Sequence, residues 1–409
     1  MTSMKWLGPT WINVSLDALE TNLEQIRSQT KAAICAVVKG DAYGHGAVAT
    51  AKFYESKQLS YLATSDLFEA VELRQTGIQM PILVLSPCLP EQAVELVKYN
   101  LTATVSHEEL VQALAKQALT QHKHAKVHIK VDTGMGRVGV SPDCAIQLAN
   151  QIINTSHLEL EGIYTHFAVA YSDHDYTKKQ FKQFLYLQEQ LKQPVYPKLI
   201  WHSANSAAFC TLPASHLDLV RIGTLLYGQS VVKPPPKLDL QSTWTLFTRI
   251  IQVKSMKRGE SIGYGRTYTT RRASVIGTIP LGYGDGLGVA PNRANHWQHI
   301  RTSLSSLLDN PRKVILDGEP YPIVGKIAMG MCCIDLTDHP HALELYGTSV
   351  EIPTRRITMN RRIPKVYSTN NKVCLILWQN RFWQPLVKGD QVYLKEISFI
   401  RAKEILQRR

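Results

Sequence analysis

The sequence lacks the features that mark membrane and secreted proteins. None of its 409 residues lies in a stretch approaching the ~18 consecutive apolar residues that a membrane-spanning helix needs. Residues 1–9 contain no apolar core and no small-residue cleavage site, so we expect no secretory signal. The seven cysteines form an odd set without a Cys-x-x-Cys pair, which argues against a disulfide framework or a zinc site. These absences predict a cytoplasmic protein with reduced thiols and no metal.

Excess positive charge is confined to the end of the chain. The formal net charge is +13, but residues 355–409 hold thirteen Lys and Arg against three Asp and Glu, a balance of +10. The preceding 354 residues therefore carry only +3. A near-neutral body with a basic tail is not a basic groove, and no nucleic-acid-binding motif is present. We expect neither nucleic acid nor a membrane as a partner.

Short apolar strands alternate with helical patterns from residue 32 to about residue 225. Ser141-Pro142 and the capping-box pattern Ser106-x-x-Glu109 each predict the start of a helix. Eight strands, each followed by a helix, predict a TIM-type (β/α)₈ barrel over residues 1–240. The predicted strands are Ala32–Val38, Ser60–Thr64, Pro81–Leu85, Leu101–Val105, Lys126–Val131, Gly162–His166, Lys198–His202 and Asp218–Ile222.

A second pattern begins after the proline run at residues 234–236. Strand-like runs follow without regular helical spacing between them, which predicts a mainly β domain over residues 241–409 with a basic C-terminal extension. Thr10–Val14 is a candidate to pair with that domain. The strand-like runs are Thr245–Val253, Ala273–Ile279, Lys313–Leu316 and Val373–Leu377, with Gln391–Leu394 in the extension.

The most informative segment is Lys39-Gly40-Asp41-Ala42-Tyr43-Gly44-His45-Gly46. Lys39 ends an apolar strand and opens a glycine-rich loop. A lysine there must find a partner or lose its charge, because burying an unpaired ammonium is costly. One resolution is a Schiff base to an aldehyde cofactor. The alternative for an isolated Lys-Gly pair is a solvated lysine at a strand end.

Two further loops suit a phosphate group. Asn205-Ser206 follows the seventh predicted strand, and Gly223-Thr224 follows the eighth. In such barrels the loops after these strands often hold a phosphate. A small hydroxyl side chain and close backbone approach at glycine suit a dianion. Each pair alone also fits an ordinary turn or helix cap.

Charged side chains lie near the ends of other barrel strands. Arg221 and Lys130 each stand between apolar residues, so their charges are expensive inside the barrel unless paired. Arg137 follows a glycine-rich turn and is able to reach an anionic oxygen. His166 closes the sixth strand and is placed to orient Arg221. The alternatives are salt-bridged core residues, a solvated arginine and a satisfied core histidine.

Glycine-flanked side chains also occur in the second domain. Tyr264 stands between Gly263 and Gly265, where backbone freedom favours close approach over packing. A tyrosine acts as an acid or base when a nearby cation lowers its pKa. The loops that contain Tyr283 and Met329 are of the same kind. Each also fits a simple turn.

These segments resemble the alanine racemases, a family of fold type III pyridoxal-phosphate (PLP) enzymes, and occur in that family's order. The likeness spans residues 9 to about 365 and includes residues 9–14, 202–207 and 220–228. It implies a cytoplasmic homodimer with shared active sites that interconverts L- and D-alanine, supplying D-alanine for peptidoglycan.

The resemblance also implies residue roles. Lys39 would carry PLP and serve as the base on one face of the substrate, with Tyr264 of the other subunit on the opposite face. Arg221, backed by His166, would meet the pyridine nitrogen. Arg137 would contact the cofactor's phenolic oxygen, oriented by a carbamylated Lys130. The phosphate would lie among Tyr43, Asn205, Ser206, Gly223 and Thr224, and the substrate carboxylate near Arg137, Tyr283 and Met329.

Two positions depart from the family pattern. Gly330 stands where an aspartate is usual, and Arg361 stands where a phosphate-binding tyrosine is usual. We expect the Arg361 guanidinium to replace that phenol. The alternatives to an alanine racemase are a racemase of broader substrate range, a PLP decarboxylase of the same fold, and a non-catalytic PLP-binding protein.

Overall fold

The computed structural model describes residues 8–192, 194, 196, 198–230, 238–289, 312–388 and 391–407. The chain forms two compact units, one of Asp17–Thr243 with Ser398–Arg409 and one of Met1–Leu16 with Trp244–Ile397. The proline run near residue 235 lies outside the described residues. The predicted domain boundary near residue 240 therefore does not describe the two ends of the chain. The N-terminal segment up to Leu16 belongs to the mainly β unit, and the segment from Ser398 belongs to the barrel unit.

The first unit is a nearly closed barrel of eight parallel strands, in the order β8-β7-β6-β5-β4-β3-β2-β9. Backbone hydrogen bonds from Asp218 N to Trp201 O (3.0 Å) and from Arg221 N to Ala204 O (3.0 Å) join β9 to the segment at β8. All eight predicted strands are present, which confirms the barrel. They are β2 (Ala33–Val37), β3 (Tyr61–Thr64), β4 (Ile82–Val84), β5 (Thr102–Val105), β6 (Ala125–Lys130), β7 (Leu158–Tyr164), β8 (Ile200–His202) and β9 (Leu219–Ile222).

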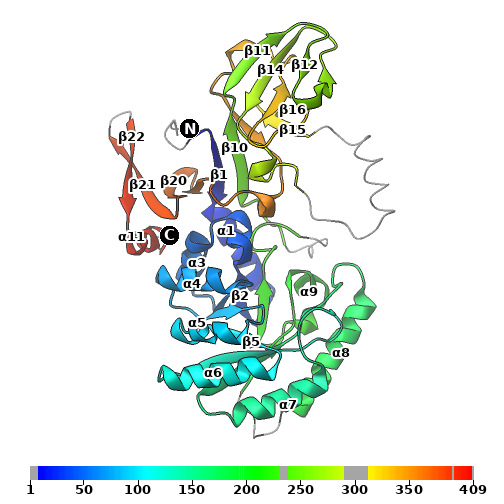
Figure 1. The fold of residues 1–409 in the computed structure, drawn as a ribbon, viewed down its shortest axis with the longest axis vertical. Helices are drawn as coiled ribbons and strands as arrows, with labels where there is room; N and C mark the ends of the chain where they lie inside the picture. Colours follow the sequence, from blue (N-terminus) through cyan, green and yellow to red (C-terminus); the bar gives the residue numbers. More distant parts are fainter. Residues whose placement is uncertain are drawn as a thin grey trace. The chain divides into compact units, whose positions relative to one another are not determined.

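Helices follow the barrel strands and cover the sheet (Figure 1). Ser141 caps its helix as predicted, because its hydroxyl accepts the Cys144 N–H. The predicted capping box is wrong: that helix starts at Glu108, with His107 at the cap position and no side-chain cap. No helix among the described residues is long and apolar enough to cross a membrane. The helices are α1 (Leu16–Ser28), α3 (Ala47–Ser56), α4 (Leu67–Gln75), α5 (Ala93–Lys98), α6 (Glu108–Thr120), α7 (Pro142–Ile153), α8 (His174–Gln190) and α9 (Ser206–Thr211).

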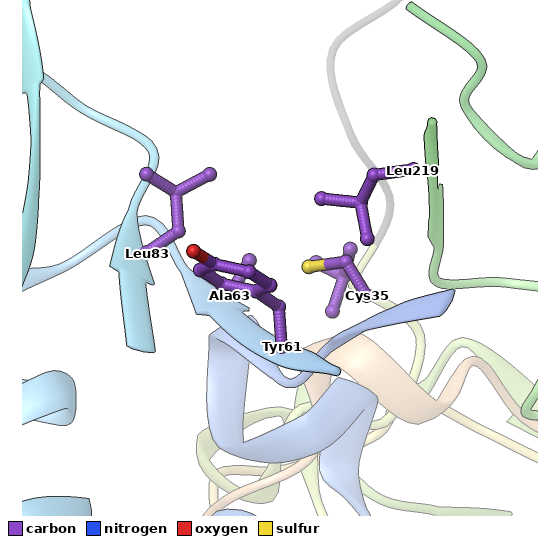
Figure 2. Close-up of a cluster of buried hydrophobic side chains, with 6 residues drawn as sticks. Cys35, Tyr61, Ala63, Leu83 and Leu219 are labelled. Carbon is purple, nitrogen blue, oxygen red and sulfur yellow. The ribbon is translucent and has the colours of Figure 1, made fainter. Parts of the chain in front are cut away.

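Apolar side chains from neighbouring barrel strands pack against one another (Figure 2). Cys35 is paired in register with Tyr61, and the cluster also contains Ala63, Leu83 and Leu219. Tyr61 and Ala63 share a face because side chains two residues apart in a strand point the same way. Each large apolar side chain buried here contributes about 1.5–3 kcal/mol relative to exposure. This packing fixes the strands whose carboxyl ends carry the polar residues.

The second unit is built on a sheet of twelve strands, in the order β11-β14-β17-β16-β15-β18-β10-β1-β19-β20-β21-β22. Thr10–Val14 lies in β1 (Thr10–Ser15), which pairs with β10 and β19 as expected. The run Thr245–Val253 is two strands rather than one, β10 (Trp244–Arg249) and β11 (Gln252–Met256). The others are β14 (Ser274–Ile279), β15 (Lys313–Leu316), β16 (Glu319–Val324), β17 (Cys332–Asp335), β18 (Ser349–Ile352), β19 (Lys365–Thr369), β20 (Lys372–Trp378), β21 (Arg381–Lys388) and β22 (Gln391–Ile397).

The basic extension contains the predicted strands and one helix that the sequence patterns did not predict. After β22 the chain forms α11 (Phe399–Gln407), which packs against α3 of the barrel unit. Lys403 Nζ lies 2.8 Å from Glu55 Oε2, and Lys52 Nζ lies 5.7 Å from the centre of the Phe399 ring. The chain thus returns to the barrel unit after its last strand.

Candidate active site

A cavity of about 690 Å³ lies at the carboxyl ends of the barrel strands. Lys39 follows β2, Lys130 ends β6, and Gly223 follows β9. Every site residue predicted within residues 17–243 lines this cavity, although they come from positions far apart in the sequence. They are Lys39, Tyr43, Lys130, Arg137, His166, Asn205, Ser206, Arg221, Gly223 and Thr224.

The cavity lining is strongly cationic. It includes the basic side chains of Lys39 and Lys130 and the guanidinium groups of Arg137 and Arg221. Among its described lining residues there is no Asp or Glu. No group of three or more His, Cys, Asp or Glu in the described part of the chain could hold a metal ion. The cavity therefore favours an organic anion, such as a phosphate or carboxylate.

The pKa of Lys39 is lowered. Burial is the largest cause, followed by the positive charges of Arg137 and Arg221, while the carboxylate of Glu69 acts in the opposite direction. A lowered pKa increases the fraction of neutral amine, which is the form that attacks a carbonyl carbon. Lys39 therefore has the electrostatic setting of a nucleophilic lysine.

The backbone after Lys39 makes a left-handed turn. Gly40, Asp41, Ala42 and Tyr43 have φ values of 63, 56, 52 and 54°. A non-glycine residue in this conformation costs roughly 1–2 kcal/mol. Such strain persists only where surrounding contacts impose it, and it is common at functional sites. The turn delivers two side chains to the cavity, the lysine at its start and Tyr43 at its end.

The two predicted phosphate loops lie side by side. Ser206 Oγ accepts the Gly223 N–H at 3.0 Å, and Asn205 Oδ1 accepts the Ala208 N–H at 2.9 Å. A Cβ atom on Gly223 would lie 2.4 Å from the Tyr43 hydroxyl, so a side chain at this position would displace Tyr43. Burial raises the pKa of Tyr43 to about 12, which keeps its hydroxyl a hydrogen-bond donor.

Arg221 is held almost entirely by backbone carbonyls and histidine. Its Nη2 donates to Thr165 O at 2.7 Å and to Ser203 O at 3.1 Å. The predicted partner is His166, whose Nδ1 lies 3.5 Å from Arg221 Nη2. His202 is closer, since its Nδ1 lies 2.9 Å from Arg221 Nη1. Burial lowers the pKa of Arg221 to about 10, which leaves the guanidinium charged at neutral pH.

A hydrogen-bond chain extends from Arg221 through two buried histidines. His202 Nε2 lies 2.9 Å from His128 Nδ1, and His128 Nε2 lies 3.2 Å from Glu161 Oε2. Because a guanidinium only donates, His202 Nδ1 accepts, so each histidine carries its proton on Nε2 and passes a donor toward Glu161. Burial lowers the pKa of both histidines, consistent with neutral rings. The sequence patterns did not identify this chain, since its members lie on separate strands.

Lys130 is buried in the same cavity. Its Nζ donates to Val131 O at 3.3 Å and lies 5.0 Å from the centre of the Tyr164 ring. Burial, followed by the charge of Arg221, lowers the pKa of Lys130 to about 7. A substantial fraction of this amine is therefore neutral near physiological pH.

The other predicted site residues belong to the β unit. Tyr264 lies in a turn between β12 (Ser261–Ile262) and β13 (Tyr268–Thr269), and 75% of it is exposed. The loops of Tyr283 and Met329 are joined, because the Gly284 N–H donates to Met329 O at 2.8 Å. Arg361 is exposed in the turn before β19. The structure therefore groups the predicted residues in two sets, one in each unit.

Comparisons with known proteins match most of the chain, including the parts that hold the predicted site residues. The family model described as "Alanine racemase, N-terminal domain" matches residues 14–231, and "Alanine racemase, C-terminal domain" matches residues 243–364. The chain belongs to the alanine racemase family. Residues 365–409, which include α11, lie beyond the second match.

Individual alanine racemases are similar over most of their length. "Alanine racemase 1" of Caldanaerobacter subterraneus subsp. tengcongensis is 41% identical over 342 residues, covering 82% of this chain and 84% of that protein. The alanine racemase of Clostridium tetani is 38% identical over 339 residues, covering 81% and 83%.

Solved alanine racemase structures share the fold. The enzyme of Clostridium difficile 630 has a TM-score of 0.81 at 32% identity, covering 90% of this chain and 98% of that chain. The alanine racemase of Bacillus anthracis with bound L-Ala-P has a TM-score of 0.77 at 30% identity, covering 90% and 97%.

Proposed function

We propose that this chain is a PLP-dependent alanine racemase that works through two opposed bases, Lys39 and Tyr264. Interconversion of L- and D-alanine is the activity of the family to which it belongs. The observation that carries the proposal is the barrel cavity, which joins a lysine of lowered pKa to an otherwise cationic lining. A ligand that carries both an aldehyde and a phosphate suits this cavity, because the aldehyde can bond to the lysine amine and the cationic lining can bind the phosphate.

The residues of the cavity fit PLP. The neutral amine of Lys39 would bond to the aldehyde, and the Ser206 and Tyr43 hydroxyls beside Gly223 and Thr224 would hold the phosphate. When bound, PLP withdraws electrons from the substrate and so makes its α-carbon proton more acidic.

Arg221 would limit that electron withdrawal. Its guanidinium remains charged and faces the ring nitrogen in this proposal, so a proton on that nitrogen would meet a like charge. A weaker electron sink favours rapid return of the proton to the α-carbon. The hydrogen-bond chain to Glu161 helps to orient the guanidinium.

The substrate carboxylate would be bound by Arg137, the backbone amide of Met329 and Tyr283. A relative with bound L-Ala-P supports an alanine-sized ligand in such a site. The neutral amine of Lys130 would react with carbon dioxide to give a carbamate, releasing one proton. That anion would pair with Arg137 and replace a costly buried cation. The proposal places Arg361 at the phosphate and Tyr264 in the site of the other subunit of a homodimer.

The test is incubation of the purified protein with single enantiomers of several amino acids, followed by measurement of both enantiomers and of amine products. Alanine racemisation in both directions is the expected result. Amine products would indicate a decarboxylase, and no turnover with retained PLP would indicate a binding protein. Either of these two results would contradict the proposal.

The assay includes amino acids larger than alanine because of Gly330. A Cβ atom placed on Gly330 would meet no described heavy atom within 4 Å, so the loop presents neither bulk nor charge there. Racemisation of larger amino acids at rates comparable with alanine would assign the chain to the broader-specificity alternative.

A further inference from the structure

Glu69 lies under the turn that follows Lys39. It belongs to α4 and is buried, with 6% of the residue exposed. Its Oε1 accepts the Asp41 N–H at 2.9 Å, while its Oε2 accepts the Gly40 N–H at 3.2 Å and the Thr64 hydroxyl at 2.6 Å. One carboxylate therefore holds the two N–H groups that open the left-handed turn.

These two N–H groups are costly to leave unpaired. They stand at the start of the turn, as the first N–H groups of any helical turn do, and their bonds to Glu69 are part-buried, so loss of the carboxylate would leave these donors without their protein acceptor. For later N–H groups the acceptors lie within the same segment of residues 38–47. Ala42 N donates to Val38 O at 2.8 Å, and Ala47 N donates to Asp41 Oδ1 at 2.9 Å. Glu69 completes the set of bonds that offsets the left-handed strain.

We propose that Glu69 is a positioning residue that holds the left-handed turn and so sets the place and charge of Lys39. This inference rests on the proposed cofactor role of Lys39. Glu69 does not line the cavity, so it acts through the turn rather than by touching cofactor or substrate. The negative charge of Glu69 counteracts the effect of Arg137 and Arg221 on the Lys39 amine.

The electrostatic part of the role has a defined sign. The Glu69 charge raises the pKa of Lys39 against the lowering effects of burial and two guanidinium groups. Removing that charge should lower the pKa of Lys39 further. The titratable and charged groups that line the cavity with the lysine are Tyr43, Lys130, Arg137, Tyr164, His166, Tyr171 and Arg221, and Glu69 also acts on its pKa from outside the cavity.

The experiment compares Glu69→Gln with Glu72→Gln, a change of the same chemistry on the same helix. Two quantities are measured on the full-length, cofactor-free chain. One is residue-resolved hydrogen exchange of Gly40, Asp41 and α4. The other is the pH midpoint at which a trace amine-acylating reagent labels Lys39, which is independent of racemisation. Borohydride fixation of PLP to wild-type protein tests the proposed function separately.

In Glu69→Gln, exchange at Gly40 or Asp41 should rise about tenfold or more, because an amide nitrogen cannot accept where a carboxylate oxygen did. The Lys39 midpoint should move to lower pH, while α4 exchange stays at the wild-type level. Glu72→Gln should change none of these quantities. A folded Glu69→Gln chain in which either the exchange or the midpoint stays at the wild-type value would overturn the proposal.

Thr64→Val keeps the test decisive if Glu69→Gln does not fold. It removes the hydroxyl that anchors Oε2 but leaves the charge in place. Exchange at Gly40 should rise with no shift in the Lys39 midpoint. Wild-type exchange at Gly40 in this variant would also overturn the proposal.

Discussion

At the scale of single residues, the cavity is costly for its cations. Lys39, Lys130 and Arg221 all have lowered pKa values, and burial is the largest cause for each. Each charge is also close to other positive charges. These residues therefore impose a cost on the cofactor-free protein that binding of an anion relieves. The pH dependence of folding should record this cost.

Lys130 should make folding stability rise with pH. Its pKa is about 7 in the folded chain against an ordinary value of 10.5, so between these values the unfolded chain binds the extra proton. In carbon-dioxide-free buffer, Lys130→Met should remove this contribution and flatten the rise in unfolding free energy between pH 7 and about pH 10. Urea unfolding at several pH values measures it. Identical slopes in wild type and variant would contradict the assignment.

Glu161 should act at the acid end. Burial alone would raise its pKa, but hydrogen bonds with His128, Lys126 and Tyr61 outweigh burial and lower it to about 2. Its stabilising effect is present above the ordinary carboxyl pKa and disappears as the pH falls toward 2. Glu161→Gln should therefore destabilise the protein at pH 6 and much less near pH 3, as measured by urea unfolding.

The control for this prediction is Glu159→Gln. Glu159 is exposed, and its carboxylate lies 3.7 Å from the same Lys126 ammonium. Because exposed ion pairs contribute little, we expect a change below about 1 kcal/mol at either pH. Equal pH dependence in both variants would mean that the buried chain to Arg221 adds nothing.

At the scale of elements, the barrel strands were predictable and the contacts between them were not. Short apolar runs with helical patterns between them located all eight strands, and strand ends located the cavity residues. His128, His202 and Glu161 meet only because β6, β7 and β8 are neighbours in the closed sheet. Glu69 is similar, since nothing in its own helix signals the turn it supports. The helix at residues 399–407 was not predicted, because strand-like runs dominate the sequence pattern immediately before it.

The last helix should contribute measurably to stability. Leu406 is 1% exposed in α11, and removing a buried leucine side chain usually costs about 2–5 kcal/mol. Leu406→Ala should lower the unfolding free energy by about 2–4 kcal/mol. Ile400→Ala on the same helix is the control, because Ile400 is 74% exposed and should change stability by about 0.5 kcal/mol or less. An equal loss in both variants would show that α11 does not bury its apolar face on the barrel unit.

At the scale of the whole molecule, the predicted site residues divide between two compact units. The cavity residues belong to the barrel unit, whereas Tyr264 is exposed on the β unit. An exposed tyrosine in a glycine-flanked turn suits contact with another chain better than packing within its own. This division supports the proposed homodimer with shared sites.

Subunit mixing tests the shared site. Lys39→Ala and Tyr264→Phe chains should each be inactive alone, but a hybrid dimer contains one site with both native bases. Random exchange should restore roughly a quarter of wild-type activity, since half of the dimers are hybrids and each has one native site. Mass spectrometry of the intact dimers verifies exchange. Verified hybrids without activity would show that both bases come from one chain.

The most direct measurement is borohydride reduction of the protein with PLP bound, followed by peptide mapping. Lys39 is the centre of the account, because its lowered pKa, its turn and its cationic surroundings all point to a bond with an aldehyde. We predict that reduction abolishes activity and fixes one pyridoxyl group per chain on the peptide that contains Lys39. Fixation on Lys130, or on any other lysine with Lys39 left unmodified, would contradict it.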